Sequence, residues 1–267
     1  IQYTDMKKFF GIIALTTLVL SSCNGFLDEE AYSKFSKEDA YSNPTLVYLN
    51  TVASVYSSLD VLGLAYDCDF SAPGLTYISE FSSDLGIIQG RRSDWVDGGA
   101  HQQIFLQTWS PSHAQVKVPW TWIYKIIGLC NSSIDDIQSM LDVGGESFLQ
   151  TYIDELRAIR VFCYMQAVNL YGRVPIVTTS KTTVADVGQS TRSKGLEFLC
   201  TELDAIVANM SNLSGIKSSS EYYGRMTKGA VYAMMAKVAA NAAVWSKDTW
   251  NDGTFTGGVE KVGQTVT

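Results

Sequence analysis

Positive charge is scarce in this sequence. It contains 20 Lys and Arg against 27 Asp and Glu, which gives a formal net charge of −7. Proteins that bind nucleic acids usually carry a basic patch that neutralises phosphates, and no such patch occurs along this chain. The composition therefore argues against nucleic acid as a partner.

Metal-ligand spacings are also lacking. The chain has 5 Cys and 2 His, with no Cys-x-x-Cys pair and no His/Cys spacing suited to zinc. If Cys23 is modified, as argued below, Cys68, Cys130, Cys163 and Cys200 allow three disulfide pairings in an exported protein. The last three lie among apolar residues of helical segments, where a free cysteine behaves as a small hydrophobic residue. Buried thiols are the favoured interpretation, and we expect no metal site and no cofactor.

Recognisable catalytic motifs are absent as well. The sequence has no Gly-x-Ser-x-Gly turn, and His101 and His113 lie in an irregular region without a nucleophile motif. A glycosidase needs two carboxylates that face each other across the substrate. Asp135 and Asp136 are adjacent and cannot do so. We expect no enzyme activity; a secreted hydrolase built from distant carboxylates is an alternative without a specific motif.

The longest apolar run lies near the N-terminus and is too short to span a membrane. Lys7 and Lys8 precede the run FFGIIALTTLVL, and small residues follow it directly before Cys23. A membrane-spanning helix needs about 20 apolar residues, whereas a basic, apolar, small order is typical of a signal peptide. The alternative is a buried core helix. We predict that residues 1–22 are a signal peptide.

The residues directly before Cys23 indicate which kind of signal peptide this is. The sequence LSSC, residues 20–23, resembles a bacterial lipobox. The resemblance implies cleavage before Cys23 and lipidation of this residue. Stable attachment to a membrane needs more than one acyl chain, and a lipoprotein cysteine carries several. The mature protein is therefore expected to stay on a membrane.

Helical periodicity dominates the rest of the chain. Asn43 and Pro44 open the first pattern as a candidate N-cap and first helical residue. Gly172 and Pro175 occupy the positions of a helix C-cap and a stop signal. We predict two antiparallel helix pairs, 120–137 with 152–171 and 193–210 with 227–245. Trp120 and Asp154 lie 34 residues apart, and so do Ser193 and Thr227. This spacing is the period of tetratricopeptide repeats, although the exact consensus of that repeat is absent.

One long stretch, from Gly63 to Pro119, has no such periodicity. Long irregular segments are usually functional or disordered, and disordered segments are poor in aromatic residues. This stretch is rich in them: Tyr66, Phe70, Tyr77, Phe81, Trp95, Phe105 and Trp109. We expect this stretch to be an ordered, irregular segment that forms a functional surface.

The stretch ELRAIRVFCYMQAVNLYGRVPIV, residues 155–177, resembles the signature helix of the SusD/RagB family of outer-membrane lipoproteins. Other landmarks of the family occur in order along the chain, on both sides of this helix: CNGFLDEE, EFSSDLG, WTWIYKIIGLCNSSID, ELDAIVANM and GRMTKGAVYAMMAKVAANAAVW. The resemblance covers Cys23 to about Trp250. Several ordered motifs are more specific than any one of them alone.

The resemblance implies an all-α fold of tetratricopeptide-like antiparallel helix pairs with long irregular loops. It also implies capture of glycans or other nutrients at the cell surface, without catalysis. The lipid-anchored protein is expected to cover a SusC-like TonB-dependent transporter in the outer membrane. Family members are roughly twice as long, so residues 23–267 are expected to be an incomplete, N-terminal SusD-like region. The alternative is a tetratricopeptide-like interaction scaffold without a small ligand.

Arg157 and Arg160 of the signature helix are interpreted as structural, because a buried Arg is usually paired and its fork matches carboxylates and helix-end carbonyls. Sugar binding instead needs flat aromatic faces beside hydrogen-bonding groups. The sequence QGRRSDWVDGG, residues 89–99, has this mixture. We predict ligand contacts from Trp95, Arg91 and Asp94, and weaker ones from Tyr77, Trp109 and Trp250. The alternative is that Trp95 fills a minor core under the loop.

Overall fold

The computed structural model describes residues 41, 43–60, 75–83, 85–88, 90, 97–210 and 223–248. The chain divides into two units, residues 1–42 and residues 43–267, and every element named below belongs to the second. The predicted signal peptide, Cys23 and Cys68 lie outside the described residues. Among the described helices, none has the length and apolar character needed to cross a membrane.

The fold is all-α, as predicted. Helices make up nearly all of its regular structure: α3 (Pro44–Tyr48), the π-helical turn η1 (Leu49–Ala53), α4 (Ser54–Asp60), α5 (Leu75–Phe81), η2 (Asp97–Gly99), α6 (Ala100–Phe105), α7 (Ala114–Asp142), α8 (Leu149–Tyr171), η3 (Val184–Asp186), α9 (Arg192–Asn209) and α10 (Lys228–Trp245). The described strands, β1 (Val174–Pro175) and β2 (Gln189–Ser190), form one short antiparallel pair with Val174 opposite Ser190.

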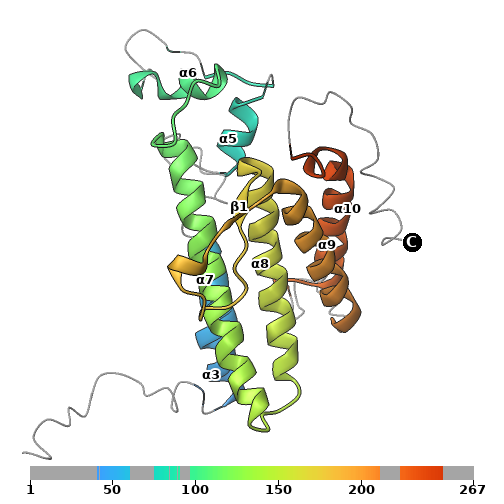
Figure 1. The fold of residues 1–267 in the computed structure, drawn as a ribbon. Coiled ribbons are helices and arrows are strands. Elements are labelled where there is room, and N and C mark those ends of the chain that lie inside the picture. The colour runs from blue at the N-terminus through green and yellow to red at the C-terminus, as the bar shows by residue number, and fades with distance from the viewer. Residues whose placement is uncertain are drawn as a thin grey trace, which may run out of the picture. The chain divides into compact units, whose positions relative to one another are not determined.

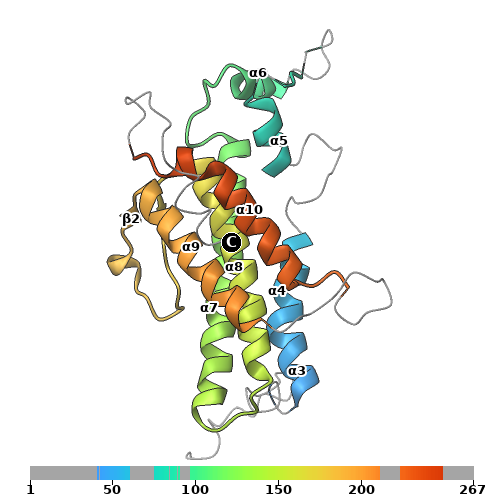
Figure 2. The ribbon, with the colours of Figure 1, turned by 90° about the vertical axis from the view of Figure 1, so that its right-hand side faces the viewer.

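Two long helices form the centre of the bundle. In Figure 1, α7 and α8 run side by side in opposite directions, and in Figure 2, α9 and α10 lie across α8 while α3 and α4 lie beside it. Contacts join α7 to α8, α8 to α9 and α9 to α10 in chain order. Both predicted antiparallel pairs are therefore confirmed. This succession of neighbouring hairpins is the arrangement expected for tetratricopeptide-like stacking.

The apolar stripes that predicted these helices form the core. Ile123, Ile127 and Ile137 of α7 are at most 2% exposed, and Leu156 and Ile159 of α8 are fully buried. A fully buried aliphatic side chain stabilises the fold by about 1.5–3 kcal/mol. The interface between α7 and α8 therefore supplies a large share of the stability of the bundle.

Cys130 and Cys163 are buried thiols, as predicted: both are 0% exposed and free. For Cys200 the same prediction was wrong, because this residue is free but only half-buried on α9. Burial raises the pKa of Cys130 to about 12 and that of Cys163 well above its usual range. These groups therefore stay protonated and unreactive at neutral pH.

The predicted helix ends hold at several positions. The Asn43 side chain accepts a 3.0 Å hydrogen bond from the Leu46 backbone, so Asn43 caps α3 and Pro44 follows as the first helical residue. Gly172 ends α8 with φ of 72°, a left-handed value that favours glycine.

Pro119 is where the prediction was wrong. The irregular region was placed between Gly63 and Pro119, but it contains α5 and α6, and Pro119 lies inside α7. A proline interrupts helical hydrogen bonding because it lacks an N–H and crowds the preceding turn. In the turn that Pro119 interrupts, the Tyr171 hydroxyl donates a 2.7 Å hydrogen bond to the Val116 carbonyl.

Candidate functional site

Tyr77 and Trp109 are the two predicted ligand contacts that lie within the described residues. Arg91, Asp94, Trp95 and Trp250 lie outside them, so their assignment stays a prediction. The described residues on either side of the sequence 91–96 belong to a small subdomain made of α5, the turns around it and α6. We call this part, residues 75–113, the α5–α6 unit.

The α5–α6 unit has its own small core. Tyr77, Ile88 and Ile104 are buried together, and Phe81, Trp109 and Val116 pack against them. The structure therefore brings Tyr77 and Trp109 into one cluster. Tyr77 is only 9% exposed, and its hydroxyl is hydrogen-bonded to Nδ1 of His101. Its position favours a packing role beneath the surface, whereas the half-buried Trp109 keeps part of its ring accessible.

Two further contacts close the α5–α6 unit. The Gln107 side chain donates a 2.9 Å hydrogen bond to the Ser82 carbonyl, which joins the end of α6 to the end of α5. The His113 ring lies 3.3 Å from the Ala100 carbonyl and joins the start of α7 to the start of α6. The unit is thus tied at both ends by side-chain contacts to backbone carbonyls.

The surface of the α5–α6 unit exposes large aliphatic groups. Leu85 is 84% exposed, Leu106 is 63% exposed and Ile87 is 45% exposed. Exposed glutamines, Gln102 and Gln103, lie on α6. Apolar area beside side-chain amides is the mixture that suits a sugar, whose ring has C–H faces and hydroxyl edges.

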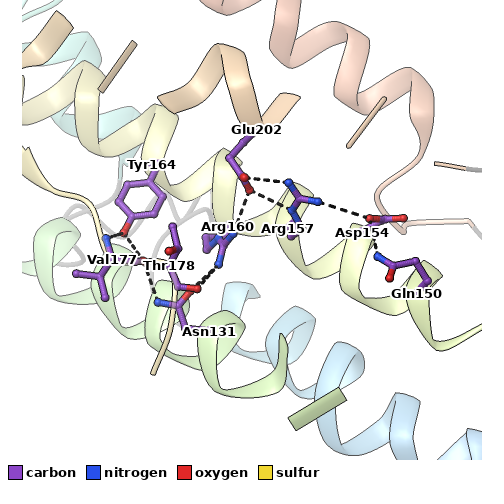
Figure 3. A network of polar contacts seen from close by, with 9 residues as sticks. All are labelled: Asn131, Gln150, Asp154, Arg157, Arg160, Tyr164, Val177, Thr178 and Glu202. Carbon is purple, nitrogen blue, oxygen red and sulfur yellow. Dashed lines mark hydrogen bonds and ion pairs between the residues drawn. The ribbon is translucent and has the colours of Figure 1, made fainter. Parts of the chain in front are cut away.

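The arginines of the signature helix form a structural network, as predicted (Figure 3). Arg157 donates two hydrogen bonds to the Glu202 carboxylate of α9, at 3.1 and 2.9 Å, and Arg160 donates a third at 3.0 Å. Burial opposes ionisation of Glu202, but the hydrogen bonds and charges of the two arginines outweigh it and lower the pKa of this carboxyl. The network fixes α9 on α8.

The same network holds the connection between α8 and α9. Arg160 also donates to the Asn131 side chain and to the Thr178 carbonyl, at 2.9 and 2.8 Å. The Val177 carbonyl accepts hydrogen bonds from Asn131 and from Tyr164, at 2.9 and 2.8 Å (Figure 3). The residues after β1 are therefore held against both α7 and α8.

A second buried ion pair was not foreseen from the sequence. Glu155 of α8 is 0% exposed, and its two carboxylate oxygens accept hydrogen bonds from Nε and Nη2 of Arg225. The Tyr56 hydroxyl donates to Glu155 at 2.6 Å, and Arg225 lies 4.7 Å from the ring centre of Tyr48. The cluster joins α3, α4 and α8 to the residues before α10. In the sequence, Arg225 lies in the motif GRMTKG just before a predicted helix. Nothing in this motif indicates that its partner is Glu155, 70 residues earlier.

Neither arginine network resembles a catalytic or metal site. Each carboxylate in them is matched by arginines, which is the usual arrangement of a structural ion pair. Within the described part of the chain, no group of three or more His, Cys, Asp or Glu side chains is placed to hold a metal ion. The surface of the α5–α6 unit is thus the best candidate for ligand contact among the described residues.

Comparisons with known proteins agree with this arrangement. A SusD-like family model, described as starch-binding and associating with the outer membrane, matches residues 25–239. SusD-like protein P38 of Formosa agariphila is 26% identical over 254 residues, covering 90% of this chain and 46% of that protein.

Solved structures show the same fold. A laminarin-binding SusD-like protein superposes with a TM-score of 0.57 at 21% identity, covering 76% of this chain and 42% of that chain. Surface glycan-binding protein A from Bacteroides uniformis gives a TM-score of 0.58 at 19% identity, covering 76% and 44%. The names of these two proteins describe binding of laminarin and of surface glycans.

This chain spans less than half the length of these relatives. The family match nevertheless extends over most of the chain, from the residues after Cys23 to α10. The chain belongs to the SusD-like family of starch-binding, outer-membrane-associated proteins.

Proposed function

We propose that this protein captures an oligo- or polysaccharide at the cell surface and delivers it to a SusC-like TonB-dependent transporter. The observation that carries the proposal is the family match over residues 25–239. It is supported by the α5–α6 unit, which exposes apolar and amide groups and whose intervening sequence contains Arg91, Asp94 and Trp95.

The chemistry of these residue types fits a sugar. The C–H face of a pyranose stacks on an aromatic ring, and indole rings offer a large rigid area at low entropic cost. Arginine donates and carboxylates accept hydrogen bonds from sugar hydroxyls. In this proposal Trp95 provides the stacking face, Arg91 and Asp94 bind hydroxyls, and Trp109 and Trp250 extend the apolar area.

The proposed location follows from the N-terminal sequence. A lipid on Cys23 holds the protein on the outer membrane, with the helical bundle outside. This position keeps a captured glycan near the transporter, which raises its local concentration there. Structurally similar proteins named for binding laminarin and surface glycans support a carbohydrate as ligand.

The test is native affinity electrophoresis of the full-length protein through gels containing different polysaccharides, laminarin and starch among them. At least one polysaccharide should retard the protein, and the recovered polysaccharide should keep its chain length. Tyr232 is 51% exposed on α10 and is not among the predicted ligand contacts, so Tyr232→Ala should migrate like the natural protein. Normal migration in every gel would favour the interaction scaffold, and shortened polysaccharide would favour the hydrolase.

A further inference from the structure

The turn after α6 has an unusual residue at its key position. The Thr108 amide bonds to the Gln103 carbonyl at 2.9 Å, and the Gln107 amide bonds to the Ile104 carbonyl at 3.2 Å. This pair of bonds defines a Schellman motif, in which the residue after the C-cap takes the left-handed conformation and is usually glycine. Gln107 occupies that position with φ of 55°, the one non-glycine residue with positive φ in the described part of the chain.

A side chain at this position is strained, because the left-handed conformation crowds Cβ against the backbone. Glycine would avoid the strain, but it has no group to reach α5. The Gln107 amide makes that contact with Ser82, across 25 residues of sequence. Glycine would end the helix equally well, so helix termination does not explain a glutamine at position 107. The hydrogen bond to Ser82 does explain it.

The hydrogen bond from Gln107 holds Ser82, the first residue after α5. The Ser82 amide still bonds to Ile78 in the last turn of that helix, at 3.1 Å. A few residues later, Ile88 enters the small core and is 7% exposed. Between these fixed points, Leu85 and Ile87 are presented to solvent. Gln107 therefore holds Ser82, and the small core holds Ile88, on either side of Leu85 and Ile87.

We propose that Gln107 is a positioning residue for carbohydrate binding. Its side-chain amide holds Ser82 at the end of α5, so that Leu85 and Ile87 form an apolar rim on the α5–α6 unit. This inference rests on the proposed function, because it adds the described rim to the predicted sugar contacts. Gln107 itself need not touch the ligand.

Two substitutions separate this role from simple helix capping. Gln107→Gly removes the contact with Ser82 and also relieves the strain, so the melting temperature should stay unchanged or rise. Gln107→Glu keeps the strain and the size but cannot donate when ionised, so the melting temperature should fall. Both should increase amide hydrogen exchange in residues 82–88. Gln138→Ala serves as the matched control, because Gln138 is an exposed glutamine of α7 whose side-chain amide bonds to Asp142 of the same helix at 2.9 Å.

Binding is then measured in the same full-length proteins, by calorimetry with laminarin and starch. Both Gln107 variants should bind about 3- to 10-fold more weakly, the size expected for loss of one net hydrogen bond, while the control binds normally. Unchanged affinity in Gln107→Gly, or unchanged exchange in residues 82–88, would overturn the positioning role. Absence of binding by the natural protein counts against the proposed function instead, and the exchange result still decides whether Gln107 holds the stretch.

Discussion

Gly195 of α9 lies directly against Val168 of α8. A methyl group added at Gly195 would fall 2.7 Å from Cγ2 of Val168, which is closer than such atoms approach in proteins. Val168 is 1% exposed, so its side chain has little room to move. This contact, together with the bonds from Arg157 and Arg160 to Glu202, sets how closely α9 packs on α8.

Substitution of Gly195 by alanine should therefore destabilise the protein. Alanine is the better helix former by about 1 kcal/mol, but overpacking a close helix contact costs about 1–3 kcal/mol. We expect a net loss of about 1 kcal/mol in the free energy of unfolding, measured by urea denaturation.

Gly128 provides the opposite control. It is exposed in α7, and an added Cβ meets nothing within 4 Å. Gly128→Ala should thus stabilise the protein by about 0.5–1 kcal/mol through helix propensity alone. A gain in stability for both alanine variants would contradict the close packing of Gly195 against Val168.

Replacement of Glu202 by glutamine should weaken the bundle. It leaves Arg157 and Arg160 without their shared carboxylate, and breaking a largely buried ion pair costs about 2–4 kcal/mol. Glu197→Gln is the matched control, because Glu197 forms an exposed pair with Lys194 on the same helix. Its unfolding transition should stay at the same urea concentration; an equal shift in both variants would argue against the network.

The stabilisation from Glu202 should also depend on pH. Its pKa is lowered in the folded protein, so its contribution is present above the unfolded value of about 4.3 and disappears as the pH falls through the folded value. The difference in unfolding free energy between the natural protein and Glu202→Gln should therefore shrink in acid. Asp154, whose pKa is raised mainly by burial, is present in both proteins and largely cancels. A difference that is constant down to strong acid would contradict this account.

Trp95→Ala tests the predicted sugar platform. If the ring stacks on a sugar, affinity should fall by about 1–2 kcal/mol and the melting temperature should hardly change. If the ring fills a minor core, truncation should cost about 3–5 kcal/mol of stability. Calorimetry and thermal unfolding of the same full-length variant distinguish the two. Unchanged values in both would remove Trp95 and direct attention to Trp109 and Trp250.

Cys23→Ala tests the predicted anchor. Without the thiol no lipid can be attached, so metabolic labelling with palmitate should be lost and the protein should leave the membrane fraction. Cys200→Ala is a suitable control, because this half-buried thiol lies in α9. Persistent labelling of Cys23→Ala would rule out the lipobox.

The sequence predicted the helices well because their signals are local. Apolar spacing predicted α7 to α10, and Gly172 and Asn43 marked helix ends through their own backbone preferences. Pro119 misled because the turn around it is also held by Tyr171, a residue more than fifty positions away that meets Val116 only in the folded chain. A local rule cannot include such a partner.

The candidate site was harder to predict for the same reason. Tyr77 and Trp109 share a sequence region rich in aromatics, but the sequence does not say which ring is buried. Tyr77 is buried beside His101 because α5 and α6 pack together. Gln107 carried no signal at all, since its left-handed backbone and its contact with Ser82 are visible only in three dimensions.

The pairing of Glu155 with Arg225 has a consequence for the order of folding. Ribosomes make the N-terminal part first, so Glu155 is made 70 residues before the arginine that neutralises it. Until then, burying this carboxylate between α8 and the N-terminal helices is costly, because it lacks its cationic partner. Burial of Glu155 against α3 and α4 is therefore favourable only once Arg225 is available to pair with it. The residues before α10 thus supply the cation that completes the contact between α8 and the helices near the N-terminus.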